Sequence, residues 1–367
     1  MGSLSLAQQK QDRSRPGFGG PEFGGPGIGG QMKDAPPIRV VHYHRKPYGC
    51  YFSMERVFAT IREKLPGSIE CRVVECRFTS RSLFRRLWNL LEAPFHQGQV
   101  NHITGDVHYL AALLPNKRTI LTVHDCGTVT RGRGLRHFIY RLVWFQMPMW
   151  RAGVIVAISD ATRRELEQIA PAFAHKIIVI PDPLVDGFTP SPKEFYATEP
   201  TILHIGTAPN KNLERVAEAL EGLRCRMEIV GEISAGQKSA LARFGIQYSN
   251  SSRLTDEQMV EKYRSADLVE FCSTYEGFGM PIIEANSIGR PVVTSRLEPM
   301  AWVAGNAACV VDPLDPSSIR AGILRVIEDT PYREELVRLG RENARRFTAE
   351  ATARLYVECY QRIAAER

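Results

Sequence analysis

The sequence predicts an α/β protein built from two doubly wound domains. Short apolar strands alternate with helical segments along most of the chain, which is typical of parallel crossover units. The alternation stops at a proline-rich stretch and then begins again, which indicates two such units in series. With 367 residues the chain is too long for one typical core and long enough for two domains of ordinary size.

Residues 1–36 are predicted to form a disordered tail. This stretch is rich in glycine and proline and twice repeats Phe-Gly-Gly-Pro. Such a composition cannot bury enough apolar surface to offset the entropy that is lost on ordering. The folded part is therefore expected to begin with an apolar strand at Ile38.

The first domain is expected to span residues 37–184. Short apolar runs mark its strands, at 38–43, 71–76, 100–104, 119–125, 153–159 and 176–181. Helices are expected between them, at 53–64, 81–91 and 160–169. Ser159 or Asp160 is the expected N-cap of the last helix, because both side chains can accept hydrogen bonds from the first turn.

Residues 185–199 are predicted to be a linker, because Pro190 and Pro192 interrupt them. The second domain, residues 200–346, repeats the alternation of strands and helices. Its strands are expected at 201–206, 226–231 and 266–273, and its helices at 212–222, 235–244 and 256–265. A last helix, at 349–364, is expected within the terminal segment, residues 347–367.

Composition is that of a globular protein, with 44% hydrophobic and 24% charged residues and a mean hydropathy of −0.21. No apolar run reaches the ~18 residues of a membrane span, and the N-terminus lacks the pattern of a signal peptide, so a cytoplasmic location is expected.

The eight cysteines are scattered without metal-ligand spacing, and we expect them to be reduced. The net charge of +7 suits nucleic acid, an anionic membrane or an anionic substrate and does not choose among them.

One segment, from Phe271 to Glu284, carries most of the functional information. It reads as a buried strand, a glycine-rich turn and a helix opened by Pro281. In a parallel sheet such a turn lies at the carboxyl end of a strand, where its free N–H groups attract an anion such as a diphosphate. Glu284 could then accept hydrogen bonds from a ribose, and Glu276 could reach the next group along, a sugar.

The string Glu276-Gly-Phe-Gly-Met-Pro-Ile-Ile-Glu284, followed by Ala285-Asn-Ser-Ile-Gly-Arg-Pro-Val-Val-Thr-Ser295, resembles the E-x7-E signature of retaining glycosyltransferases of the GT-B fold, family 4 (glycosyl transferase group 1). The resemblance implies two Rossmann-like domains that face a cleft, the first binding the acceptor and the second the nucleotide sugar. It also implies that the terminal helix packs back on the first domain. The alternative is an ordinary strand-loop-helix with solvent-facing glutamates.

The resemblance further implies which residues form the site. The expected catalytic residues are His124 at the rim of the cleft, Lys211 as the diphosphate-binding cation, and Glu276. Donor binding is expected at Gly206, Thr207, Asn210, Lys211, Gly277, Phe278, Gly279, Met280 and Glu284. The chain departs from the family twice: no arginine accompanies Lys211, and Trp302 stands where relatives commonly place a glutamate. A structural histidine and a solvated lysine are the alternatives for His124 and Lys211.

In the first domain, the residues expected to meet the acceptor are Tyr48, Gly49, Gly105, Asp106 and His108. The last three follow a strand that ends in a turn. Tyr48 and Gly49 take the place of the family's first glycine-rich turn, although the usual double glycine is Gly49-Cys50 here.

Basic and aromatic residues are mixed at 131–145, and a second arginine cluster lies at 81–86 before Trp88. In the family such helices often rest on an anionic membrane, which suits a lipid-linked acceptor. A half-buried helix with a solvated arginine face is the alternative. Nucleic acid is not expected as a partner, since no base-reading motif accompanies the charge.

The resemblance therefore implies a retaining hexosyltransferase that uses a nucleoside diphosphate sugar, such as GDP-mannose or a UDP-sugar, in surface polysaccharide or glycolipid assembly. No Asp-x-Asp triplet occurs, so we expect neither a required metal nor another cofactor. A related epimerase or phosphorylase fits the sequence less well. A scaffold that binds sugar nucleotides without catalysis is the alternative of a different class, and slow release of free sugar from a donor would separate it from an enzyme.

Overall fold

The computed structural model describes residues 36–47, 53–127 and 134–366. The predicted tail therefore lies outside the described residues, apart from residue 36. So do Tyr48 and Gly49, two of the residues expected to meet the acceptor.

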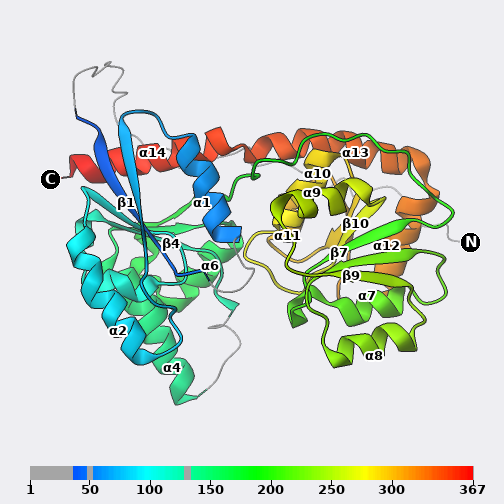
Figure 1. Ribbon diagram of the computed structural model, residues 1–367, viewed down its shortest axis with the longest axis horizontal. Coiled ribbons are helices and arrows are strands. Elements are labelled where there is room, and N and C mark those ends of the chain that lie inside the picture. Colours follow the sequence, from blue (N-terminus) through cyan, green and yellow to red (C-terminus); the bar gives the residue numbers. More distant parts are fainter. Residues whose placement is uncertain (1–35, 48–52, 128–133, 367) are drawn as a thin grey trace, which may run out of the picture. The chain divides into compact units, whose positions relative to one another are not determined.

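The first sheet has six parallel strands in the order β2-β1-β3-β4-β5-β6 (Figure 1). Its strands are β1 (Ile38–His44), β2 (Ile69–Glu75), β3 (Val100–Ile103), β4 (Thr119–Val123), β5 (Val154–Ala157) and β6 (Ile177–Val179). Strands β3, β4 and β5 are buried along their whole length, because helices cover both faces of a parallel sheet. The α-helices of this part are α1 (Ser53–Glu63), α2 (Leu83–Glu92), α4 (Leu135–Arg141), α5 (Met147–Arg151) and α6 (Asp160–Ile169). We call this part the first lobe.

The second lobe contains a second parallel sheet of six strands in the order β12-β11-β10-β7-β8-β9. Its strands are β7 (Thr201–Ile205), β8 (Arg226–Val230), β9 (Tyr248–Ser251), β10 (Leu268–Phe271), β11 (Val292–Ser295) and β12 (Cys309–Val311). Its helices are α7 (Leu213–Ala219), α8 (Ala235–Arg243), α9 (Asp256–Ser265), α10 (Met280–Ile288), α11 (Met300–Ala304), α12 (Pro316–Glu328) and α13 (Thr330–Ala344). The predicted fold class, two doubly wound α/β units, is confirmed.

Sequence patterns do not identify β9, β12, α12 or α13. Strand β9 reads Tyr-Ser-Asn-Ser and lies at the edge of its sheet, so it carries no apolar signal. Helices α12 and α13 do have start signals, since the side chains of Asp315 and Asp329 accept hydrogen bonds from Ser317 and Tyr332.

The predicted basic, aromatic stretch at 131–145 is not one regular helix. Its described part consists of α4 followed by a π-helical segment, Leu142–Gln146, which leads into α5. Residues 131–133 lie outside the described residues. The change in helical pitch turns Trp144 and Phe145 into the core of the first lobe.

Helix α14 (Ala349–Ala365) packs against α1, β1 and β3 of the first lobe (Figure 1). Its buried Tyr360 hydroxyl lies 2.9 Å from His42 Nε2 and 2.8 Å from His102 Nδ1. The other ring nitrogen of His102 lies 2.7 Å from Thr122 Oγ1. Buried polar groups of this kind are stable only when they are hydrogen-bonded, so the network ties the helix to the sheet.

The histidines of this network are held in the neutral form. Burial lowers the pKa of His42 and of His102 well below the ordinary value, and burial with Arg62 and Arg45 nearby lowers the pKa of His44 to about 4. A folded-state pKa below the unfolded value means that the unfolded chain binds more protons. As far as these histidines are concerned, the free energy of unfolding has its full value above about pH 6.5 and decreases as the pH falls below it.

We therefore expect the melting temperature to fall steadily between pH 6.5 and pH 5. Each fully shifted histidine contributes about 1.4 kcal/mol per pH unit to the loss of unfolding free energy. The measurement is thermal unfolding by circular dichroism across this range, with His42→Phe compared with His175→Asn at an exposed site. The first variant should show a shallower pH dependence than the second. A melting temperature that does not change with pH would contradict the neutral buried network.

Candidate active site

The loops after β7 and β10 meet at one edge of the second sheet, because these parallel strands are neighbours. Asn212 fixes the first of these loops. Its backbone is left-handed, with φ 67°, and its buried side-chain amide donates hydrogen bonds to the carbonyl oxygens of Cys272 (3.1 Å) and Pro313 (2.6 Å). The loop after β7 is thereby tied to the beginning of the glycine-rich turn after β10.

Lys211 and Glu276 form an ion pair where the two loops meet. Lys211 Nζ lies 2.6 Å from Glu276 Oε1, and the side chains are 20% and 15% exposed. The amide of Asn210 donates to the same oxygen at 3.3 Å, and Lys211 Nζ also lies 4.7 Å from the ring centroid of Phe271. Gly206 has φ 90°, and a β-carbon there would lie 2.8 Å from Lys211 Cε, so glycine leaves room for the lysine stem.

Helix α10 begins at Met280, directly after this turn, with Pro281 in its first turn. The first N–H groups of a helix have no acceptor within the helix, and the helix dipole adds a partial positive charge there. Gly279, with φ 124°, provides the reversal before the helix, and Phe278 anchors the turn in the core. The arrangement offers an anion both a cation and backbone donors.

Glu284 lies in α10 and accepts a hydrogen bond from the hydroxyl of Tyr263, a fully buried residue of α9. Burial raises the pKa of Glu284, while Tyr263, Arg56 and Lys211 act in the opposite direction. Arg56 comes from α1 of the first lobe and pairs with Asp256 Oδ1 at 2.9 Å. Sequence reasoning missed Tyr263, because its contact with Glu284 depends on how α9 packs on α10.

His124 lies at the carboxyl end of β4 and is partly buried. Its Nε2 lies 2.9 Å from the carbonyl oxygen of Thr104, and its Nδ1 lies 3.5 Å from Asp182 Oδ2. Burial alone would lower the pKa of His124, but Asp182 and the Thr104 carbonyl outweigh burial and raise it to about 8. The ring is therefore largely an imidazolium at neutral pH, and both of its N–H groups point to first-lobe acceptors. Asp182, which no sequence motif marks, stabilises the positive charge of the His124 ring.

Gly277 lies where the glycine-rich turn packs tightly against the first lobe. A β-carbon at this position would lie 1.8 Å from the carbonyl oxygen of His124 and 3.2 Å from Asp125 Cβ. No other residue fits there without moving the backbone. The Gly277 carbonyl also accepts a hydrogen bond from Ser159 Oγ (2.8 Å), and Thr162 Oγ1 lies 3.3 Å from it.

Tyr275 fastens the same turn to the first lobe. Its hydroxyl donates to Glu165 Oε2 at 2.9 Å and accepts from the backbone N–H of Cys126 at 3.0 Å. A β-carbon on Gly127 would lie 2.7 Å from the Tyr275 ring, so the ring and the loop after His124 are in close contact. Burial raises the pKa of Tyr275, which keeps its hydroxyl protonated as a donor.

Three of the residues expected at the acceptor site are described, and the structure does not bring these three to one surface. Asp106 is exposed and pairs with Arg45 at 2.6 Å, and Gly105 lies beside Met54. His108 is buried, and its Nδ1 lies 3.0 Å from the carbonyl oxygen of Trp144. Burial lowers the pKa of His108, as expected for an interior histidine.

Thr207 faces the loop after β8 rather than Glu276. Its hydroxyl donates to the carbonyl oxygen of Glu232 at 2.7 Å, and its own carbonyl accepts from Gln237 Nε2 at 2.9 Å. Among the described residues, no three histidine, cysteine or carboxylate side chains gather as they would around a metal ion.

Part of the chain matches a known protein family. Residues 199–329 match the family model described as Glycosyl transferases group 1. O-antigen chain mannosyltransferase B of Escherichia coli is 29% identical over 233 residues, which cover 57% of this chain and 61% of that protein. MMP alpha-(1->4)-mannosyltransferase of Mycolicibacterium hassiacum is 28% identical over 282 residues, which cover 67% of this chain and 66% of that protein. The matches thus span about two thirds or less of these relatives.

Solved structures resemble nearly the whole chain. Sucrose-phosphate synthase from Thermosynechococcus elongatus superposes with a TM-score of 0.73 and 16% identity, over 90% of this chain and 100% of that one. HepE of Anabaena, solved in complex with UDP and glucose, gives a TM-score of 0.69 and 16% identity, over 88% and 99%. The resemblance found in the sequence is confirmed: the chain has the GT-B fold, and its residues 199–329 match the glycosyl transferases group 1 family.

Proposed function

We propose that this protein is a retaining hexosyltransferase that moves a sugar from a nucleoside diphosphate sugar to an acceptor hydroxyl. The observation that carries the proposal is the meeting of Lys211, Asn210 and Glu276 beside the first turn of α10. The family match supports it, because the matched residues include this whole site. The two relatives described above are named mannosyltransferases, which favours a mannose donor such as GDP-mannose, with a UDP-sugar as the alternative.

The diphosphate would bind between Lys211 and the N–H groups of Phe278, Gly279 and Met280. In the structure the Lys211 ammonium is neutralised by Glu276. A diphosphate carries more charge than one carboxylate, so it would draw the ammonium toward itself and leave Glu276 free to accept hydrogen bonds from sugar hydroxyls. As the sugar leaves, negative charge grows on the diphosphate, where the lysine and the helix dipole stabilise it.

The rest of the donor would be held from both lobes. Glu284, oriented by Tyr263, would accept hydrogen bonds from the ribose. The positive ring of His124 would face the sugar from the first lobe, with Asp182 keeping it charged. We propose that the reaction needs no metal or other cofactor, because Lys211 and the backbone amides supply the positive charge.

One alternative is a scaffold that binds sugar nucleotides without turnover, acting in polysaccharide assembly. Asn210 stands where many relatives carry a second cation, and Trp302 replaces a usual glutamate. Both departures lower the expected rate of transfer, but neither removes Lys211 or Glu276. Release of free sugar from a donor separates the two functions.

We expect slow release of free sugar when the full chain is incubated with GDP-mannose or a UDP-sugar, with the same rate in the presence of EDTA. Lys211→Ala should lower that rate about 100-fold, since one donor to the developing charge is worth this much in other enzymes. Lys238→Ala, at an exposed position of α8, is the matched control. No release from any donor in the panel would favour the scaffold. Release at the parent rate by Lys211→Ala would show that another group neutralises the diphosphate.

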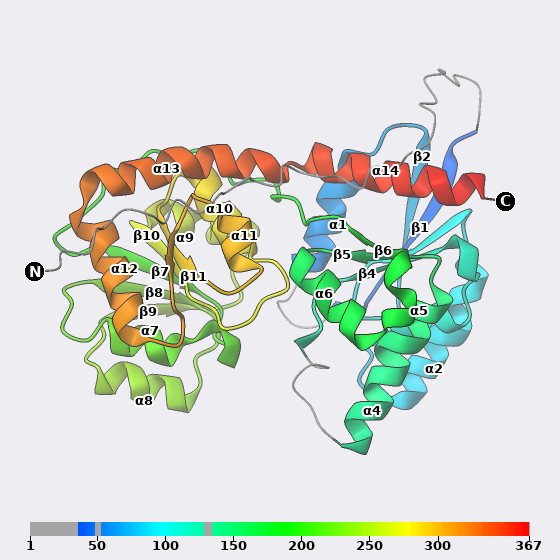
Figure 2. The same ribbon diagram turned by 180° about the vertical axis from the view of Figure 1, so that it is seen from behind.

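A separate proposal concerns the membrane. None of the helices in the described part of the chain is long and apolar enough to cross a bilayer. Helices α2 and α4 both lie at the same end of the first lobe (Figures 1 and 2), and Arg86 of α2 stacks 4.5 Å above the ring of Trp144 in the segment after α4. These two helices, Phe95 and the segment after α4 expose large apolar side chains: Leu83, Phe84, Leu87, Trp88, Leu91, Phe95, Leu135, Phe138, Ile139, Leu142 and Val143. We call these residues the apolar face.

We propose that the apolar face rests on an anionic bilayer at the inner side of the cell membrane, near a lipid-linked acceptor. Phe84 and Phe95 are 75% and 86% exposed, which is costly in water and favourable in the interfacial region of a membrane. Exposed Arg81 and Arg85 beside them would attract anionic lipid at about 1 kcal/mol each. Arg141 instead donates to the carbonyl oxygens at the end of α6, so it serves the fold.

We expect the full chain to co-sediment with vesicles that contain phosphatidylglycerol, and less so at high salt. Phe84→Asp combined with Phe138→Asp should abolish sedimentation, because it places two charges on the apolar face. Tyr196→Asp, at an exposed linker position, is the control and should sediment like the parent. Equal sedimentation of parent and double variant would contradict the proposal, as would no sedimentation of either.

A further inference from the structure

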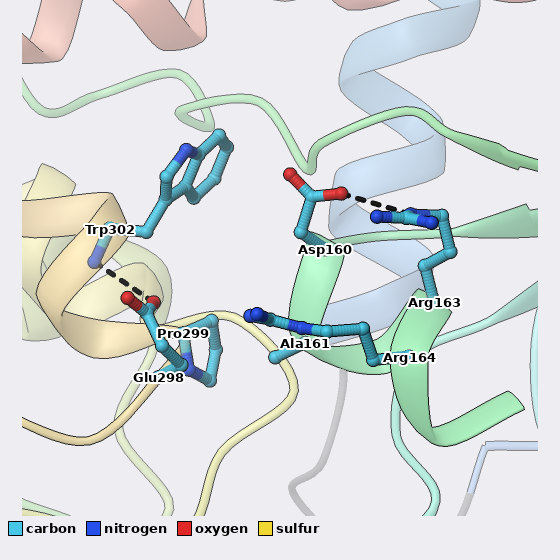
Figure 3. Close-up of a pocket in the computed structure, with 7 residues that line it drawn as sticks. All are labelled: Asp160, Ala161, Arg163, Arg164, Glu298, Pro299 and Trp302. Atoms are coloured by element: carbon cyan, nitrogen blue, oxygen red, sulfur yellow. Dashed lines mark hydrogen bonds and ion pairs between the residues drawn. The ribbon is translucent and has the colours of Figure 1, made fainter. Parts of the chain in front are cut away.

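A pocket of about 300 Å³ lies between the start of α6 and the start of α11. Figure 3 shows its lining, which is Asp160, Ala161, Arg163 and Arg164 from α6 and Glu298, Pro299 and Trp302 from the second lobe. None of these residues belongs to the donor site described above. In the sequence, Trp302 stands out only as a departure from the family pattern.

Both walls of the pocket are attached to the glycine-rich turn of the donor site. Ser159, the N-cap of α6, donates a hydrogen bond to the carbonyl oxygen of Gly277 at 2.8 Å. On the other wall the ring centroid of Phe278 lies 6.3 Å from that of Trp302. The pocket is therefore adjacent to the turn that carries Glu276, although it shares no lining residue with the donor site.

The lining combines an aromatic ring with balanced charge. The indole of Trp302 is partly buried and is supported by the edge of Phe347, with ring centroids 5.8 Å apart. Across the pocket, Asp160 is bonded to Arg163 at 3.0 Å (Figure 3). Glu298 accepts from the backbone N–H of Trp302 at 3.2 Å, and Figure 3 shows Arg164 extending toward Glu298.

This chemistry suits a saccharide better than an anion or a lipid chain. The two carboxylates cancel the attraction of the two guanidinium groups for a phosphate, and an acyl chain would remove water from four charged side chains without bonding to them. A pyranose offers a C–H face that packs on an aromatic ring and hydroxyls that both donate to carboxylates and accept from guanidinium groups. The volume is at the lower end of the range for small-molecule sites, which fits one sugar unit.

We propose that this pocket binds a sugar unit of the acceptor, distal to the hydroxyl that receives the transferred sugar. The protein would thereby recognise an oligosaccharide rather than a single sugar. The inference rests on the proposed function, because it assigns a glycan acceptor to that reaction. It also explains why Trp302 replaces the usual glutamate, because the C–H face of a sugar packs on an aromatic ring and not on a carboxylate.

To test this proposal, the full chain is titrated with mannose and with α-linked mannotriose. Binding is measured by saturation-transfer NMR and by calorimetry. Mannose units are the probe because the relatives named above are mannosyltransferases. We expect mannotriose to bind the parent at least fivefold more tightly than mannose. Trp302→Ala should weaken mannotriose binding about tenfold, whereas Trp302→Phe should keep most of it.

Asp160→Asn tests the same pocket without disturbing the packing around Phe347, and it should weaken mannotriose binding about fivefold. Trp150→Ala, at an exposed position of α5, is the matched control and should bind like the parent. Mannotriose that does not bind the parent, or that binds the Trp302 and Asp160 variants equally well, would overturn the proposal. If sugar is released from a donor and mannotriose does not bind, the pocket assignment alone fails. If mannotriose binds through Trp302 and no donor is turned over, the proposed function fails instead.

Discussion

The close approach of Gly277 to the His124 carbonyl is the constraint on which the rest of the site depends. A β-carbon at Gly277 would lie 1.8 Å from that oxygen, so the glycine-rich turn can reach the first lobe only with glycine here. Once the two backbones meet, Ser159 can bond to the Gly277 carbonyl and Tyr275 can bond to Glu165. These contacts bring the turn that carries Glu276 against the loop that carries His124.

Each charged group of the site is paired with a group of opposite charge. Lys211 is neutralised by Glu276, and His124 is kept protonated by Asp182. Because the first pair is only partly buried, a diphosphate can displace the carboxylate without leaving a buried charge alone. The second pair lies within the first lobe and need not change. Under the proposed function, binding a donor would therefore move one side chain, Lys211, while the fold holds the other groups in place.

Sequence reasoning could predict the parts of the site that local patterns encode. The strand, turn and helix around Glu276 have their own apolar, glycine and proline signals, and Lys211 follows a neighbouring strand in the same way. It could not predict Tyr263 or Asp182, because both act across contacts between distant segments. His108 shows the opposite failure: it follows the expected turn, but the short helix after that turn directs its ring inward. The apolar face and the pocket likewise depend on which surfaces stay uncovered.

Calorimetric titration of the full chain with GDP and UDP tests the central claim most directly, because it examines the E-x7-E turn without an acceptor. The account predicts that at least one of them binds with one-to-one stoichiometry. Glu284→Ala should bind it about 10- to 150-fold more weakly, since a hydrogen bond to a charged acceptor contributes about 1.5–3 kcal/mol. Glu218→Ala, on the exposed side of α7, should bind like the parent. A folded Glu284 variant that binds as tightly as the parent, or a parent that binds neither nucleotide, would contradict the account.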